Sequence, residues 1–130
     1  MIFGPELNDG THYFVFGSNR AGRHGKGAAL QAKTFWGAIN GQGQGPQGCS
    51  YAIPTKDENL NPLSLREIGI EVGKFLDFAY DYPDITFLVT KIGCGLAGND
   101  EADIRPMFTG APPNCLFAWD EGNYESVRFG

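Results

Sequence analysis

The sequence is poor in cysteine, histidine and long apolar runs. Its three cysteines, Cys49, Cys94 and Cys115, form no CxxC pair, which argues against a disulfide framework or a zinc ribbon. No apolar run approaches the roughly 18 residues that a membrane-crossing helix needs. Residues 1–10 lack the basic and apolar regions of a signal peptide. We therefore expect a cytoplasmic protein with no metal or other cofactor.

Positive charge is also scarce, with 10 Lys and Arg residues against 15 Asp and Glu residues and a net charge of −5. From this balance no broad basic face for nucleic acid or for a membrane surface can be assumed. It still permits a small anion site built from backbone amides. The chain of 130 residues is 42% hydrophobic and 19% charged, values typical of a globular protein. We expect one domain, residues 1–130.

Glycine, in contrast, is abundant: the chain has 19 glycines, about twice the usual share. They show no three-residue period, which excludes collagen. Many lie in three segments, 17–27, 37–48 and 93–98. Segment 37–48 contains five glycines and a proline, so we predict a mobile surface loop there.

Apolar periodicity predicts strands that alternate with helices. The second strand should end at Pro54, which cannot donate a ladder hydrogen bond. Ser64 and Glu67 have the spacing of a helix capping box. Strand–helix alternation favours an α/β fold with a mostly parallel sheet flanked by helices. The expected strands are 13–16, 50–54, 85–90 and 115–119, and the expected helices are 28–36, 64–80 and 99–108.

Two of the glycine segments, 17–27 and 93–98, follow a strand and precede a helix. Because the carboxyl ends of parallel strands share one edge of the sheet, both loops should meet there. Backbone N–H groups of glycine turns and of helix starts suit phosphate, so we predict a phosphate or nucleotide site. The first loop lacks GxGxxG order and the chain has no GxxxxGK[ST] motif. Rossmann-type NAD binding and ATP hydrolysis are therefore disfavoured.

Several motifs carry a family resemblance over about residues 13–108. Asn19 after a strand, the turn 25–30 (Gly-Lys-Gly-Ala-Ala-Leu) and the later Gly-x-Gly-x-x-Gly loop resemble the macro domain superfamily of ADP-ribose-binding modules. Segments 53–57 (Ile-Pro-Thr-Lys-Asp) and 91–98 (Lys-Ile-Gly-Cys-Gly-Leu-Ala-Gly) resemble one branch of it. That branch contains terminal ADP-ribose protein glycohydrolase and DNA ADP-ribosyl glycohydrolase antitoxins, and small phage-encoded macro-like proteins are also similar. The resemblance implies a three-layer macro-domain-like fold.

The resemblance also implies roles for individual residues. Lys56 matches the branch's reactive lysine, which engages the anomeric carbon of the distal ribose. Residues expected to hold the distal ribose are Ser18, Asn19, Gly25, Gly27 and Ala28. Thr55 is a further expected ligand contact, and His24 is a candidate phosphate contact or acid. Residues expected to wrap the pyrophosphate are Gly93, Cys94, Gly95, Leu96, Ala97 and Gly98.

Two departures from the branch bear on these roles. Ala97 stands where the glycohydrolase has an acidic residue, so Asp100, or in reserve Asp57, is the candidate acid. No Gly-Asp pair near the amino end matches the usual adenine-contacting aspartate, which leaves adenine recognition unassigned. Trp36 and Tyr51 are placed near the loops as candidates for stacking on a base.

Some side chains have a second interpretation. His24 is either a ligand contact or simply an exposed loop residue, and exposure is the more common state of a lone loop histidine. Cys94 is either a nucleophile, since helix N-termini lower thiol pKa values, or a small residue in a tight loop. No histidine is placed beside Cys94, which favours the small-residue interpretation.

Three functions remain open at this point. The first is hydrolysis of the link between ADP-ribose and a protein or DNA partner. No membrane partner is expected. The second is a non-catalytic binder, or sponge, of ADP-ribose-type nucleotide signals, such as a phage protein would use. The third is a scaffold that has lost its ligand. Lys56 favours the first, and Ala97 favours the second.

Overall fold

A computed structural model describes residues 4–94 and 98–119 of the chain. Its centre is a five-stranded sheet with the order β2-β3-β1-β4-β5. Strands β3, β1, β4 and β5 run parallel, and β2 pairs antiparallel with β3. The strands are β1 His12–Asn19, β2 Gly45–Gln47, β3 Ser50–Lys56, β4 Thr86–Val89 and β5 Cys115–Phe117.

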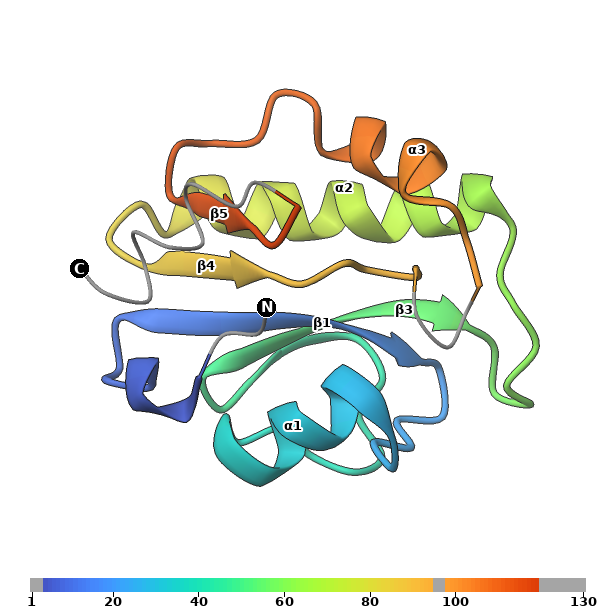
Figure 1. Ribbon diagram of the computed structural model, residues 1–130, viewed down its shortest axis with the longest axis horizontal. Coiled ribbons are helices and arrows are strands. Elements are labelled where there is room, and N and C mark those ends of the chain that lie inside the picture. Colours follow the sequence, from blue (N-terminus) through green and yellow to red (C-terminus); the bar gives the residue numbers. More distant parts are fainter. Residues whose placement is uncertain (1–3, 95–97, 120–130) are drawn as a thin grey trace.

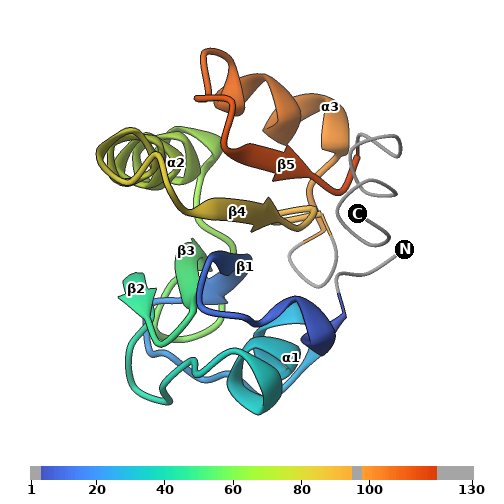
Figure 2. The same cartoon turned by 90° about the vertical axis from the view of Figure 1, so that its left-hand side faces the viewer.

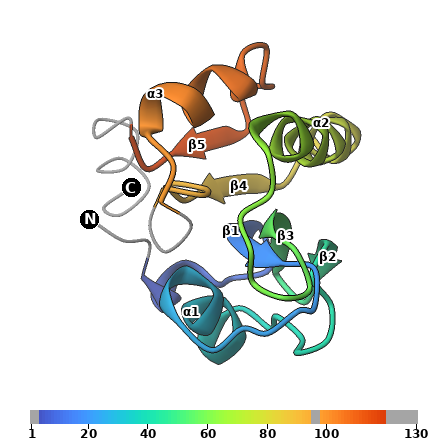
Figure 3. The same cartoon turned by 90° about the vertical axis from the view of Figure 1, so that its right-hand side faces the viewer.

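Helices cover both faces of this sheet. Figure 1 shows α1 on one side and α2 with α3 on the other, and the end-on views of Figures 2 and 3 separate the three layers. The expected α/β class and three-layer arrangement are confirmed. The helices are α1 Gly27–Phe35, α2 Leu65–Asp81 and α3 Glu101–Ile104, with short 3-10 turns η1 Pro5–Leu7 and η2 Arg105–Phe108. Within the described ranges, no helix has the length and apolar character needed to cross a membrane.

The longest helix, α2, begins where the sequence predicts. The Ser64 hydroxyl accepts from the Glu67 N–H at 3.1 Å, and the Glu67 carboxylate accepts from the Ser64 N–H at 3.2 Å. This reciprocal pair satisfies two backbone donors that the helix start would otherwise leave unpaired. The hydrogen bonds from Ser64 lower the pKa of Glu67, so its carboxylate stays ionised at neutral pH.

Alternation along the strands produces two separate cores. On β1, Val15 packs in the cluster beneath α2, whereas Phe14 and Phe16 pack in the cluster beneath α1. Phe14 stacks on Trp36 with ring centroids 5.3 Å apart. Since both faces are covered, the strands read as nearly continuous apolar runs rather than as alternating ones.

Two predictions about the middle of the chain are wrong. Segment 37–48 contains β2, which pairs in register with β3 through Gly45 and Ala52. Three of its five glycines, Gly37, Gly43 and Gly48, lie against backbone, since a Cβ added to any of them would come within 3.1 Å of a backbone atom. Strand β3 also continues past Pro54 to Lys56, because Pro54 lies opposite a register shift between Ser18 and Asn19. Such an irregularity tolerates a residue that lacks an N–H.

Gly69, inside α2, offers a test of the helix. A Cβ added there would meet no atom within 4 Å, so Gly69→Ala should raise the free energy of unfolding by about 0.5–1 kcal/mol in urea denaturation. Gly10→Ala is the matched control, because its Cβ also meets open space but its φ is +88°. That variant should lose stability. Equal effects at both sites would contradict this explanation.

Candidate functional site

Strands β1, β3 and β4 run parallel, so their carboxyl ends share one edge of the sheet, at the right in Figure 1. Three connections leave this edge: the first loop (residues 20–26), the β3–α2 loop (57–64) and the β4–α3 loop (90–100). Lys56 is the last residue of β3 and lies at the same edge. The structure therefore brings together the segments that the sequence placed there, as the topology requires.

Backbone atoms meet closely at this edge. A Cβ added to Gly17 of β1 would lie 3.3 Å from the Gly93 nitrogen and 3.6 Å from Thr55 Cγ2. Thr55 is buried and its hydroxyl donates to the Ser18 carbonyl at 3.2 Å. One residue from each of β1, β3 and the β4–α3 loop thus forms a tight junction, which we call the glycine junction (Gly17, Thr55 and Gly93).

The β4–α3 loop is held by Asn99. Its side-chain amide and its backbone N–H donate to the Gly93 carbonyl at 3.1 and 2.9 Å. Gly93 has φ of +72°, a conformation that favours glycine. The exposed Gly98 also has a positive φ, of +78°. The predicted ligand residues Gly95, Leu96 and Ala97 lie outside the described residues.

Cys94 is half-buried, with its thiol donating towards the Ile92 carbonyl at 3.5 Å. Burial raises the pKa of this thiol, and the nearby Glu101 carboxylate raises it further. The thiol is therefore protonated at neutral pH and a poor nucleophile. This supports the interpretation of Cys94 as a small residue in a tight loop.

The start of the first loop is closed by side chains of β1. The Asn19 amide nitrogen donates to the Arg23 carbonyl at 2.9 Å, and its oxygen accepts from the Arg23 N–H at 3.0 Å. The Ser18 hydroxyl donates to the Gly43 carbonyl. Ser18 and Asn19 are both buried, so their side chains shape the loop from beneath.

His24 is 1% exposed, so the expectation of an exposed loop histidine is wrong. Its Nε2 lies 3.1 Å from the Gln42 carbonyl and 3.2 Å from Gln47 Oε1. Its ring packs edge-on against Phe16. Segment 37–48 folds over the ring and removes it from solvent. Any contact of His24 with a ligand at the surface must therefore come from its backbone.

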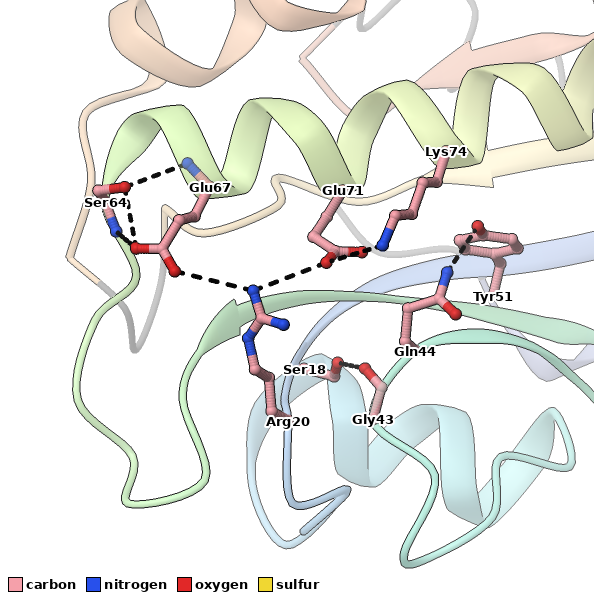
Figure 4. Close-up of polar contacts among 9 residues, drawn as sticks. All are labelled: Ser18, Arg20, Gly43, Gln44, Tyr51, Ser64, Glu67, Glu71 and Lys74. Atoms are coloured by element: carbon pink, nitrogen blue, oxygen red, sulfur yellow. Dashed lines mark hydrogen bonds and ion pairs between the residues drawn. The ribbon is translucent and has the colours of Figure 1, made fainter.

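The far side of the first loop is tied to α2 by charge, as Figure 4 shows. Arg20 Nη2 lies 3.8 Å from Glu67 Oε2 and 3.7 Å from Glu71 Oε2. Glu71 is 3% exposed and also accepts from Lys74 Nζ at 3.3 Å. Two cations thus compensate this buried carboxylate, and the residue that begins the first loop is fixed against the helix.

The start of α1 supplies unpaired donors. Its N-cap residue, Lys26, makes no side-chain capping hydrogen bond, and the first N–H bonded within the helix is that of Leu30. The N–H groups of Gly27, Ala28 and Ala29 therefore have no hydrogen-bond partner within the described part of the chain. An uncapped helix start next to an exposed glycine, Gly25, can accept an anion.

The titratable residues of the site differ in their surroundings. Lys56 is half-buried and Asp100 is exposed, and neither side chain forms an ion pair with another described residue. Asp57 accepts from the N–H groups of Asn59 and Asn61 at 2.8 and 2.9 Å. The Asn61 and Asn59 hydrogen bonds lower the pKa of Asp57, so Asp57 is a turn residue.

Trp36 and Tyr51, expected near the loops, are instead buried in the two cores. Trp36 is 0% exposed on the α1 side and Tyr51 is 2% exposed on the α2 side. Burial, with a contribution from Glu71, raises the pKa of Tyr51 to about 12. Neither ring is available to stack on a base. The described residues also contain no group of His, Cys, Asp and Glu side chains that could hold a metal ion.

Sequence reasoning missed residues whose role depends on tertiary contact. Gly17 and Gly43 permit close backbone approach, Arg20 ties the first loop to α2, and Asn99 closes the β4–α3 loop. The glycines were visible as composition only. The ion pair and the Asn99 contacts left no pattern in the sequence, because their partners are set by the fold.

Gly43 tests the packing of segment 37–48 on the first loop. An added Cβ would overlap the Asn19 carbonyl oxygen, so Gly43→Ala should lower the free energy of unfolding by about 1–3 kcal/mol. Gly25→Ala is the control, because its Cβ meets nothing within 4 Å and its φ is not positive. Urea denaturation compares them. A fully stable Gly43→Ala variant would refute the close contact.

Comparison with known proteins supports the architecture. No family model and no curated protein matches the chain. Among solved structures, it is similar to the macrodomain of Mycobacterium tuberculosis DarG, with a TM-score of 0.61 and 21% sequence identity. The match covers 85% of this chain and 91% of that one. At this identity the likeness concerns the fold, and the chain has the macrodomain fold.

Proposed function

We propose that this chain binds ADP-ribose, or an ADP-ribosyl group, at the shared edge of β1, β3 and β4 and hydrolyses its link to protein or DNA. The observation that carries the proposal is the uncapped start of α1 at the edge where the glycine junction and Lys56 also lie. Such an edge offers N–H donors to the oxygen atoms of a nucleotide and an amine to its sugar. The macrodomain fold and the family resemblance agree with this ligand.

In this proposal the two glycine loops divide the ligand between them. The pyrophosphate binds the backbone amides of residues 93–98, and the distal ribose lies against the first loop and Gly27 and Ala28. The buried His24 and the Asn19–Arg23 hydrogen bonds support that loop from beneath. Pre-formed donors lower the cost of ordering the site when the ligand binds.

Lys56 is the proposed nucleophile. Its neutral amine forms a bond to the anomeric carbon of the distal ribose while the bond from that carbon to the linked group breaks. A proton from the amine nitrogen passes, through Asp100, to the departing group. Water then attacks the same carbon, ADP-ribose is released and the amine is restored. The attack needs a neutral amine, so in this proposal the ammonium proton first passes to Asp100, from which the departing group takes it up.

Asp100 is preferred over Asp57 as the group that moves this proton. The Asp57 carboxylate is occupied by two backbone N–H groups of its own turn. Asp100, at the N-cap of α3, makes no side-chain capping hydrogen bond. It therefore retains both oxygens for a proton or for a bound group.

A non-catalytic binder is the second candidate function. The observation in its favour is Ala97, which stands where the similar glycohydrolase has an acidic residue. A site with intact phosphate donors but without an acid would hold the nucleotide without turning it over.

Binding is tested by calorimetric titration with ADP-ribose. Gly25→Val should weaken binding at least tenfold, because Gly25 is exposed beside the start of α1 and a branched side chain would cover those donors. Its fold should persist, since an added Cβ meets no atom within 4 Å. Gly69→Ala, remote on α2, should bind as the parent does. Unchanged affinity in Gly25→Val would refute the ribose-side placement.

Turnover is tested on aspartyl- or glutamyl-linked ADP-ribosyl protein and on thymidine-linked DNA. Lys56→Ala should abolish release of ADP-ribose while changing affinity little, because the amine acts on the bond and not on the phosphates. Asp100→Ala should slow release by about 10²-fold, the lower end of the general acid–base range. Full turnover in Lys56→Ala would overturn the mechanism. Tight binding by the parent without turnover on either linkage would establish the binder.

A further inference from the structure

Acidic and basic residues are distributed unevenly along the chain, which has a net charge of −5. Residues 10–56 contain five Lys and Arg residues and no Asp or Glu. Residues 57–130 contain the other five Lys and Arg residues and 13 Asp and Glu residues. The acid-free part forms β1, the first loop, α1, β2 and β3. Glu6 and Asp9 also lie on the α1 side of the sheet, where Leu7 packs in the α1 core and Asn8 donates to the Phe35 carbonyl. Among the described residues, the α1 side still carries more cations than anions, and the side with α2 and α3 carries more anions than cations (Figure 1). We call these two sides the basic layer and the acidic layer.

The cations on the α1 side differ from those of the acidic layer in whether they form ion pairs. Arg23, Lys26 and Lys33 are all exposed, and no ion pair joins any of them to another residue in the described ranges. In the acidic layer, Lys74 and Lys91 lie 3.3 and 3.8 Å from glutamate oxygens. We call Arg23, Lys26 and Lys33 the basic ridge. Its charges are not neutralised within the described fold and are available to an anionic partner.

The ridge follows the surface of α1. Lys26, Leu30 and Lys33 have the spacing i, i+4, i+7, which places them along one face of a helix. Seven residues rise about 10 Å along the axis. Leu30 is 43% exposed between the two lysines. The helix thus presents two separated cations with an apolar side chain between them.

A pocket of about 370 Å³ lies beside this ridge. Arg23 and Lys33 line it together with Asn40 and the glycine backbone at 22, 25 and 41. No residue of the described β3–α2 and β4–α3 loops lines it. It is therefore distinct from the glycine junction, although five of its lining residues, 21–25, belong to the first loop. Two cations, an amide side chain and glycine backbone form a concave surface suited to a phosphate group.

We propose that the basic ridge and this pocket bind the phosphodiester backbone of a single-stranded nucleic acid. A strand supplies successive phosphates for the pocket and the ridge, and sugars or bases for Leu30. The acidic layer on the opposite side of the sheet repels the same strand, so binding is confined to the α1 face. The proposal goes beyond ADP-ribose binding, because it concerns unmodified nucleic acid and a surface outside the glycine junction.

The test measures fluorescence anisotropy of a labelled single-stranded DNA 12-mer against the parent chain at several KCl concentrations. About three phosphate contacts predict a slope near −2 in log K against log [salt], at roughly −0.7 per contact. The double variant Arg23→Glu/Lys33→Glu should bind at least tenfold more weakly and with a flatter slope. Arg66→Glu/Lys91→Glu makes the same change of net charge at exposed residues of the acidic layer and should bind nearly as the parent does.

Equal binding by the ridge variant and the parent would overturn the proposal, and so would equal losses in the two double variants. Competition by poly-glutamate as effective as that by unlabelled DNA would overturn it in favour of an acidic polypeptide. Calorimetry with ADP-ribose on the ridge variant separates the two proposals. Unchanged affinity for ADP-ribose with lost DNA binding supports two surfaces. Lost affinity for both ligands in a variant with the parent's melting temperature would show a single site and overturn the separate ridge.

Discussion

The close approach of backbone to backbone at the ends of β1 and β4 is the constraint on which the site depends. A Cβ on Gly17 would lie 3.3 Å from the Gly93 nitrogen, and one on Gly93 would lie 3.4 Å from Thr55 Cγ2. A side chain at either position would press on these neighbours, and at Gly93 it would also be strained by the φ of +72°. Glycine here supplies proximity as well as conformational freedom.

A second layer of contacts fixes the first loop around this junction. Segment 37–48 contains β2 and covers His24, and its Gly43 carbonyl accepts a hydrogen bond from the Ser18 hydroxyl. Arg20 on the other side is paired with the buried Glu71. Each contact orders the loop without using the N–H groups at the start of α1. Buried polar groups thus hold the loop in place, and the N–H groups at the start of α1 remain unpaired within the described residues.

Much of the architecture was predictable from the sequence because its signals are local. The capping box at Ser64 and the apolar stripe of α2 define that helix with nearest-neighbour information alone, and the apolar run at β4 indicates a strand covered on both faces. Strand–helix alternation then requires parallel strands, which brings the ends of β1, β3 and β4 to one edge. The meeting of the two glycine loops at that edge follows from topology.

What failed depended on contacts between distant segments. The five glycines spread over 37–48 suggest mobility, yet Gly43 packs against the Asn19 carbonyl and Gly48 against the backbone of Gly37. His24 lies in a polar loop but is buried by that segment. Trp36 directly follows α1, yet its ring is buried in the core, where it stacks on Phe14. Composition records which residues permit close packing. Only the fold shows which glycines lie against a neighbour, and therefore which side chains remain at the surface to meet a ligand.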